Sequence, residues 1–259
     1  MAKSSLDQLS LFDTTALTSF SLDGGGFGTL LPPLDATEEE PDDAPIAPAV
    51  PRVVAHDFRL AGDRGLASSW KARAAGNLAA IRLMQRIEAE TRPATAEEQA
   101  VLARFVGYGA SDLANALFRR PGEAWREGWA EQGDGLEQAV SAAELASLAR
   151  CTQYAHFTPE YVVRAVWAGL TRLGFRQGSI LEPGCGTGLF LALRPEGMAD
   201  CSTVTGIEMD TVTARIAALL HPKAWIRQED FTRARIPETF DLAIGNPPFS
   251  DRTVRADDP

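Results

Sequence analysis

The chain has 259 residues, of which 45% are hydrophobic and 23% charged, with a formal net charge of −10. These fractions are ordinary for a globular protein. No apolar run reaches the roughly 18 residues of a transmembrane helix, and the N-terminus lacks the apolar core of a secretory signal. Three cysteines without a close pair (Cys151, Cys185, Cys201) indicate reduced thiols, and the three histidines are too scattered for a metal site. We therefore expect a cytoplasmic protein with no membrane partner and no metal.

The acidity is concentrated at the N-terminus. Residues 1–50 contain nine acids and one lysine, which leaves −2 for residues 51–259. Glycine and proline runs accompany these acids, so we expect residues 1–52 to form a disordered tail. A short apolar cluster at Leu6–Phe12 is the exception, with a docking peptide as its alternative interpretation. Because the acidity belongs to the tail, it does not argue against a nucleic-acid partner for the remainder.

Residues 53–150 are predicted to be helical. Apolar residues recur at helical spacing between Ala75 and Ile87. The segments Thr95–Glu98 and Ser141–Glu144 each match a capping box, which marks the start of a helix. Between them, the segment Phe105–Ala110 contains two glycines and is interpreted as a packed corner between helices.

From residue 151 to 259 the pattern changes to alternating strands and helices, which predicts a parallel α/β sheet. We expect Thr158 to cap a helix that has Pro159 at its first position, and a later helix to span Thr211–Leu220. The predicted strands are Ser179–Leu181, Thr203–Ile207, Ala224–Arg227 and Phe240–Ile244. Apolar residues alternate in the fourth strand as in a buried strand, and we expect it to lie beside the first.

The first predicted strand runs into a glycine-rich loop, Glu182–Gly188. Glycines at a strand-to-helix turn let the backbone approach a ligand closely. The spacing Gly184-x-Gly186-x-Gly188 is tighter than the Gly-x-Gly-x-x-Gly of nicotinamide dinucleotide sites. It therefore suits a nucleoside with an amino-acid tail better than a pyrophosphate, and the alternative is a tight turn without a ligand.

Acidic residues follow the next two predicted strands. Glu208 lies where it can accept hydrogen bonds from both hydroxyls of a ribose. Asp230 can accept a hydrogen bond from an adenine amine, and the adjacent Phe231 can stack on the ring. The alternatives are a solvated charge at Glu208, and a surface acid beside a core aromatic at Asp230 and Phe231.

The segment that closes the fourth strand, Asn246-Pro247-Pro248-Phe249, is the most specific signal in the chain. Two prolines fix the backbone, so the Asn246 side-chain oxygen and the Pro247 carbonyl can point at one place. These two acceptors would hold an amino group and favour a tetrahedral nitrogen whose lone pair can attack. Phe249 would stack on the ring that carries the amine, whereas a proline-rich turn is the alternative.

Together these motifs resemble the S-adenosylmethionine-dependent amino-methyltransferases, most closely the gamma group of adenine-specific DNA methyltransferases. The resemblance implies a Rossmann-like sheet, S-adenosylmethionine as cofactor, and N6-methylation of adenine in DNA. The residues that match the family's cofactor motifs are Glu182, Gly184, Gly186, Gly188, Glu208, Asp230 and Phe231, and those that match its catalytic motif are Asn246, Pro247, Pro248 and Phe249. Phe157, Thr158 and Pro159 resemble the family's aromatic-Thr-Pro motif, which packs over the methionine end of the cofactor.

The helical region adds a second resemblance. Ala75–Arg82 and Phe105–Ala110 are similar to the leader of large plasmid and phage proteins that join a methyltransferase to a helicase. Methyltransferase sheets of this kind continue with further strands and a target-recognition region. We therefore expect this chain to be the leading part of a larger enzyme of restriction-modification, plasmid or phage systems. The alternatives are methylation of a protein glutamine amide or of a ribosomal RNA amine, and a non-catalytic remnant that binds only a cofactor or partner.

Overall fold

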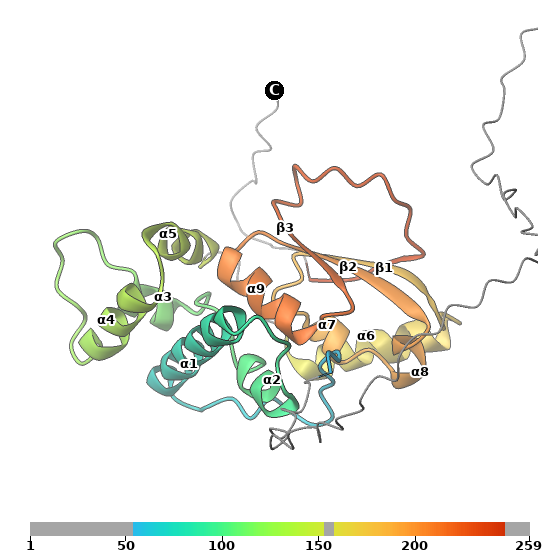
Figure 1. Cartoon of the computed structure of the whole chain (residues 1–259), viewed down its shortest axis with the longest axis horizontal. Helices are drawn as coiled ribbons and strands as arrows, with labels where there is room; N and C mark the ends of the chain where they lie inside the picture. Colours follow the sequence, from blue (N-terminus) through green and yellow to red (C-terminus); the bar gives the residue numbers. More distant parts are fainter. Residues whose placement is uncertain (1–53, 153–157, 247–259) are drawn as a thin grey trace, which may run out of the picture. The chain divides into compact units, whose positions relative to one another are not determined.

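The computed structural model describes residues 54–152 and 158–246, which belong to one compact unit, Val50–Pro259 (Figure 1). Its elements are α1 (Trp70–Ala89), α2 (Ala96–Leu102), α3 (Ser111–Leu117), α4 (Ala130–Ala139), α5 (Ala142–Cys151), α6 (Glu160–Arg172), β1 (Gly178–Pro183), α7 (Leu189–Ala192), α8 (Glu196–Ala199), β2 (Ser202–Glu208), α9 (Thr211–Leu220), β3 (Trp225–Gln228) and β4 (Leu242–Ala243). The predicted tail, Phe157 and the segment Pro247–Phe249 lie outside the described residues. Within the described ranges, no helix combines the length and apolar character needed to cross a membrane.

The four strands form a parallel sheet in the order β3-β2-β1-β4. This order is that of a Rossmann-like fold, so the predicted α/β class is confirmed. The fourth strand lies beside the first, as the sequence predicts. The strand order reverses between β1 and β4, and ligands of such sheets bind outside the carboxyl ends of the strands at this reversal.

Three strands are longer than predicted or displaced by one residue, and the fourth is shorter. As a result Glu208 is the last residue of β2 and not a loop residue after it. The predicted strand Phe240–Ile244 is reduced to Leu242–Ala243. Its start is lost because the Asp241 carboxylate accepts the Ser179 N–H at 2.7 Å and so occupies a donor that the ladder would use.

The caps explain where the helices begin. Both predicted capping boxes are present, at Thr95 and at Ser141. The predicted helix Thr211–Leu220 is confirmed as α9, with Asp210 as its N-cap. At α6 the prediction was wrong by one residue: Pro159 is the N-cap, with φ −61° and ψ 143°, and the helix begins at Glu160. Glu160 gains from this position because a carboxylate is favourable at the positive end of a helix.

The corner between α2 and α3 is held by one buried amide. Asn77 Nδ2 donates to the carbonyl of Gly107 at 2.7 Å, and Asn77 Oδ1 accepts the N–H of Val106 at 2.9 Å. The rings of Phe105 and Tyr108 are buried here and meet edge to face. The interpretation of this segment as a packed corner is therefore confirmed.

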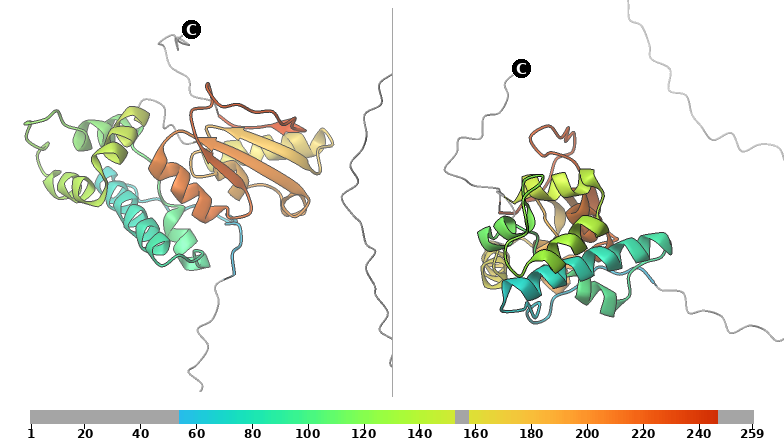
Figure 2. Two further views of the ribbon diagram at one scale, coloured as in Figure 1. Left: turned by 45° about the horizontal axis from the view of Figure 1, so that its top comes forward. Right: turned by 90° about the vertical axis from the view of Figure 1, so that its left-hand side faces the viewer.

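Helix α9 joins the helical region to the sheet. Its residues Val212, Ile216 and Leu220 belong to the hydrophobic core formed by α1–α5. The same helix packs on β2 and β3, as the views in Figure 2 illustrate. Arg215 on α9 also makes ion pairs with Glu88 of α1 and Glu144 of α5. A second core, under the sheet, packs α6 and α7 against β1, β2 and the residue that follows β4.

Candidate functional site

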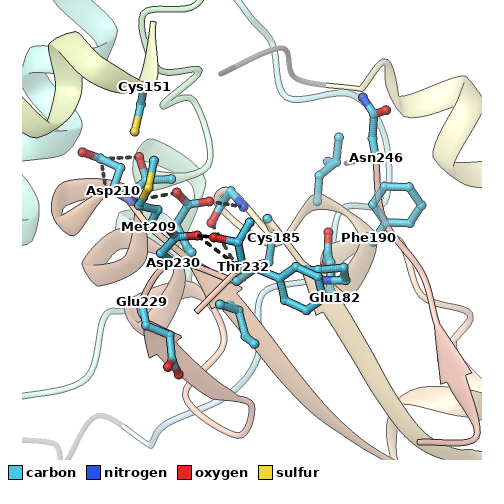
Figure 3. Close-up of a pocket in the computed structure, with 18 of the residues that line it drawn as sticks. Cys151, Glu182, Cys185, Phe190, Met209, Asp210, Glu229, Asp230, Thr232 and Asn246 are labelled. Atoms are coloured by element: carbon cyan, nitrogen blue, oxygen red, sulfur yellow. Dashed lines mark hydrogen bonds between the residues drawn. The ribbon is translucent and has the colours of Figure 1, made fainter. Parts of the chain in front are cut away.

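A cavity of about 260 Å³ opens at the carboxyl ends of the strands (Figure 3). The sequence-predicted residues that line it are Thr158, Glu182, Gly184, Gly186, Glu208, Asp230, Phe231 and Asn246. They come from five separate places in the chain, and the fold brings them together around one space. Gly188 and Pro159 do not line the cavity, and Phe157, Pro247, Pro248 and Phe249 lie outside the described residues.

The glycine loop lies against the end of the neighbouring strand. Gly184 and Gly186 have φ values of +64° and +57°, which side-chain-bearing residues rarely adopt. The Cys185 N–H donates to the carbonyl of Ile207 at 2.9 Å, and the Gly186 N–H donates to Glu208 Oε2 at 2.8 Å. The loop is thus fixed to β2 while its backbone borders the cavity.

Gly188 was predicted to be part of the cofactor-binding loop, but it does not line the cavity. It is the N-cap of α7 with a left-handed φ of +78°. A Cβ at this position would lie 2.5 Å from Cδ2 of the buried His221. Gly188 therefore allows α7 to begin next to that ring, and it contributes to the cavity only by positioning the loop.

Glu208 is held by main-chain donors on both carboxylate oxygens. Besides the bond from Gly186 to Oε2, Oε1 accepts the Asp210 N–H at 2.9 Å. A carboxylate oxygen has two acceptor positions, so both oxygens can still accept a bond from a ligand. Burial raises the pKa of Glu208 above its ordinary value.

Glu182 is a deeply buried acid of the site. Its exposed fraction is 2%, and among the described residues its Oε2 has no hydrogen-bond partner. Burial, with a further contribution from the charge of Glu208, raises the pKa of Glu182 well above its ordinary range. A buried carboxylate without a partner is costly, and a cation beside it would relieve that cost.

The charge of the described lining is of one sign. Five acids line the cavity, and no lysine, arginine or histidine of residues 54–152 and 158–246 does. The acids are Glu182, Glu208, Asp210, Glu229 and Asp230. Such a lining attracts a cation and repels phosphate. In the same ranges, no group of His, Cys, Asp and Glu is arranged to hold a metal ion.

The remaining predicted residues form the rim. Phe231 follows β3 and is 44% exposed, so its ring is available for stacking. Asp230 Oδ1 accepts bonds from the N–H and hydroxyl of Thr232 at 2.9 and 2.8 Å, which fixes that loop. Asn246 follows β4, where a Cβ on Gly245 would lie 3.2 Å from the carbonyl of Pro183. The close approach of the two strand ends puts Asn246 at the cavity, where Figure 3 shows it next to Phe190.

Several lining residues were not predicted from the sequence, and Cys151 and Asp210 are two of them. Cys151, at the end of α5, points its sulfur toward the cavity (Figure 3). Burial, together with the charges of Asp210 and Glu208, raises the pKa of the Cys151 thiol to about 12. No local motif marks Cys151, whereas Asp210 could have been found from its position as the cap of the predicted helix Thr211–Leu220.

These features define a Rossmann-like α/β domain with an acidic cavity at the reversal of its strand order. No protein-family model matches the chain. Over 100 residues it is 32% identical to Defense against restriction protein B of Escherichia phage P1, an alignment that covers 38% of this chain and 4% of that protein. Over 102 residues it is 36% identical to Type II methyltransferase M.CvrRI of Paramecium bursaria Chlorella virus XZ-6E, covering 37% of this chain and 24% of that protein.

Among solved structures, the chain is similar to the methyltransferase subunit of a type I restriction-modification system from Streptococcus thermophilus. The TM-score is 0.32 at 17% identity, with 67% of this chain and 44% of that chain covered. The chain spans less than half the length of each of these three relatives.

Proposed function

We propose that the chain is the cofactor-binding part of an S-adenosylmethionine-dependent methyltransferase that acts on the exocyclic amine of adenine in DNA. The observation that carries the proposal is the acidic cavity, where Glu182 Oε2 lacks a partner and no basic side chain lines the described wall. S-adenosylmethionine brings a sulfonium and an ammonium group, both positive. A nicotinamide dinucleotide would instead place two phosphates among these carboxylates. The relative named as a type II methyltransferase supports the same class of reaction.

In this proposal each wall of the cavity holds one part of the cofactor. Glu208 accepts hydrogen bonds from the two ribose hydroxyls. Phe231 stacks on the adenine ring, and Asp230 accepts a hydrogen bond from the adenine amine. The backbone of Gly184 and Gly186 borders the link between the nucleoside and the amino acid. Glu182 supplies the negative charge that the cationic end requires.

When bound, S-adenosylmethionine supplies a methyl group already activated by a positively charged sulfur. Asn246 accepts an N–H of the target amine through its side-chain oxygen, and the carbonyl of Pro247 accepts the other. These bonds favour a tetrahedral nitrogen, whose lone pair then points at the methyl carbon. Positioning and exclusion of water do the remaining work, and a base in duplex DNA must first be flipped out of its stack.

The first experiment measures binding to the purified chain by calorimetry. We expect S-adenosylmethionine and S-adenosylhomocysteine to bind and NAD to fail. Glu208→Ala should weaken binding by about tenfold, because two hydrogen bonds to a charged group contribute at least about 1.4 kcal/mol to the binding free energy. Glu238→Gln is the matched control, because Glu238 is an exposed acid outside the cavity. Preferential binding of NAD would overturn the cofactor assignment.

The second experiment follows labelled methyl groups into DNA, ribosomal RNA and protein, with the chain itself and with any longer protein that contains it. Label in DNA that digests to N6-methyladenine supports the proposed substrate. Label in a glutamine amide or in an RNA amine would overturn it. Cofactor binding without transfer to any pool by the longer protein would favour a non-catalytic role.

A further inference from the structure

A hydrogen-bond chain runs from helix α5 to the end of β2. The Ser147 hydroxyl donates to Asp210 Oδ1 at 2.7 Å, and the Asp210 N–H donates to Glu208 Oε1 at 2.9 Å. Ser147 is 3% exposed and Asp210 is 1% exposed. Water is therefore excluded from the first link, and a lost bond there would not be replaced by solvent.

Asp210 is held from two directions. Its Oδ2 accepts the N–H of Thr213 at 2.8 Å and the Thr213 hydroxyl at 2.6 Å, which are bonds within the first turn of α9. The bond from Ser147 to Oδ1 comes from a helix 63 residues earlier in the chain. The direction of the Asp210 peptide group, and so of the N–H that holds Glu208, depends on both anchors.

We infer that Ser147 is a positioning residue for cofactor recognition, because it orients the carboxylate of Glu208 through Asp210. The inference rests on the proposed function, in which Glu208 binds the ribose. A carboxylate that must accept two hydroxyls needs both oxygens in the plane of the ribose diol. Gly186 fixes one oxygen of Glu208, and the α5-dependent peptide of Asp210 fixes the other.

The position of α5 supports this role independently. At the C-terminal end of the same helix, Cys151 lines the cavity. The helix is therefore part of the cavity wall and not only a neighbour of α9. The competing interpretation is that Ser147 merely fastens α5 to α9, as the ion pair between Glu144 and Arg215 does. A fastening role would change stability but not the ability to distinguish ligands by their ribose hydroxyls.

The experiment measures that distinction by calorimetry on the full chain. The probes are S-adenosylhomocysteine and its 2′,3′-dideoxy analogue, and the readout is the ratio of their dissociation constants. We expect Ser147→Ala to lower the preference for the hydroxylated probe by roughly five- to tenfold, since one net hydrogen bond is at stake. Affinity for the dideoxy analogue should stay within about twofold of wild type.

Ser141→Ala is the matched control. It also removes a hydrogen-bonding hydroxyl from α5, at the N-cap, and its bonds go to Glu144 and not to Asp210. We expect it to lower stability and leave the ratio unchanged. If Ser147→Ala folds poorly, Asp210→Asn offers a second variant, because its single amide oxygen can keep the cap to Thr213 while its NH2 group cannot accept the Ser147 hydroxyl.

The possible outcomes distinguish the positioning role of Ser147 from the proposed binding of the cofactor. Equal ratios in Ser147→Ala, Ser141→Ala and wild type would overturn the positioning role while leaving cofactor binding intact. A wild-type chain that binds S-adenosylhomocysteine with no preference for the hydroxyls would contradict the ribose role of Glu208. Failure of the wild-type chain to bind either probe would overturn the proposed function and this inference with it.

Discussion

The imidazole of His221 lies directly against the backbone of Gly188, at the point where the glycine loop becomes α7. A Cβ added to Gly188 would be 2.5 Å from Cδ2 and 2.6 Å from Nε2 of that ring. Since His221 is 1% exposed and closes α9, it has little room to move. His221 at the end of α9 thus leaves no room for a side chain at Gly188, the N-cap of α7.

Gly188→Ala should therefore destabilise the protein. The left-handed backbone alone costs a non-glycine residue about 1–2 kcal/mol, and the clash with His221 adds to this. We expect the melting temperature to fall by at least roughly 4 °C in a thermal unfolding experiment. Gly197→Ala is the control, because a Cβ there meets nothing within 4 Å. Equal melting temperatures for the two variants would contradict this account of the loop.

The stability of the fold should fall as the pH drops below the ordinary range of histidine. Burial lowers the pKa of His221 from 6.5 to about 4, against the opposing effect of Asp57 and with a smaller contribution from Arg194. The unfolded chain then takes up a proton at His221 between these pH values while the folded chain does not. The contribution of the neutral His221 ring to the free energy of unfolding is therefore complete above about pH 6.5 and is lost progressively toward pH 4.

Denaturant unfolding at pH 7.5 and 5.0 tests this. The wild type should lose up to about 2 kcal/mol more than His221→Phe between the two pH values, since each pKa unit corresponds to about 1.36 kcal/mol. The raised pKa values of Glu182 and Glu208 change stability with pH in the opposite sense, and the comparison with the variant removes their effect. The same pH slope in both proteins would contradict the buried neutral state of His221.

Cofactor binding should release protons from the acidic cavity. In the free protein the raised pKa of Glu182 keeps its carboxyl protonated above the ordinary range of a glutamate. A bound cation favours the ionised form, so affinity for S-adenosylmethionine should rise with pH above about 4.5, until the raised pKa is passed. Calorimetry in buffers of different ionisation heat measures the proton count directly. Glu182→Gln should release fewer protons, whereas equal release would assign them to another group.

Cys151 should alkylate slowly and be protected by the cofactor. With a pKa of about 12, its thiolate fraction at pH 8 is about a thousandfold below that of a thiol with the ordinary value of 9. Cys201 is exposed and serves as the internal reference. Peptide mass spectrometry after iodoacetamide treatment should find Cys201 modified first, and S-adenosylhomocysteine should slow Cys151 further. Faster labelling of Cys151 with ligand present would place the ligand elsewhere.

Asn246→Ala should affect turnover and leave cofactor affinity nearly unchanged. The side-chain oxygen is proposed to act as the target nitrogen becomes tetrahedral, and loss of such an interaction typically costs about 100-fold or more in rate. The measurement is labelled methyl transfer beside calorimetry, in the protein that shows activity. Wild-type turnover in this variant would contradict the catalytic role.

Sequence predicted the parts of the fold whose signals are local. The capping boxes at Thr95 and Ser141, the helix Thr211–Leu220 and the strand order around the glycine loop all follow from short segments. The length of β4 does not follow from a short segment. It is set by the hydrogen bond from the Ser179 N–H to the Asp241 carboxylate, which joins residues 62 positions apart in the chain.

The same distinction holds for the site. Glu208 and Asp230 were predicted as site residues from their positions near the ends of two strands, and they line one cavity because parallel strands share one carboxyl edge. Cys151 lines that cavity and Ser147 bonds to Asp210, but the capping box that marks their helix gives no indication of the site. The role of Gly188 depends on His221, which sequence spacing does not connect to it.

Helix α9 belongs to the core of the helical region and also packs on β2 and β3, and this limits where the protein can be divided. Removal of residues before 151 would expose Val212, Ile216 and Leu220 to water and leave Arg215 without Glu88 and Glu144. The Rossmann-like sheet is therefore not an autonomous folding unit at that boundary. The helical region and the sheet should melt in a single cooperative transition, and recombination between related proteins should preserve them together.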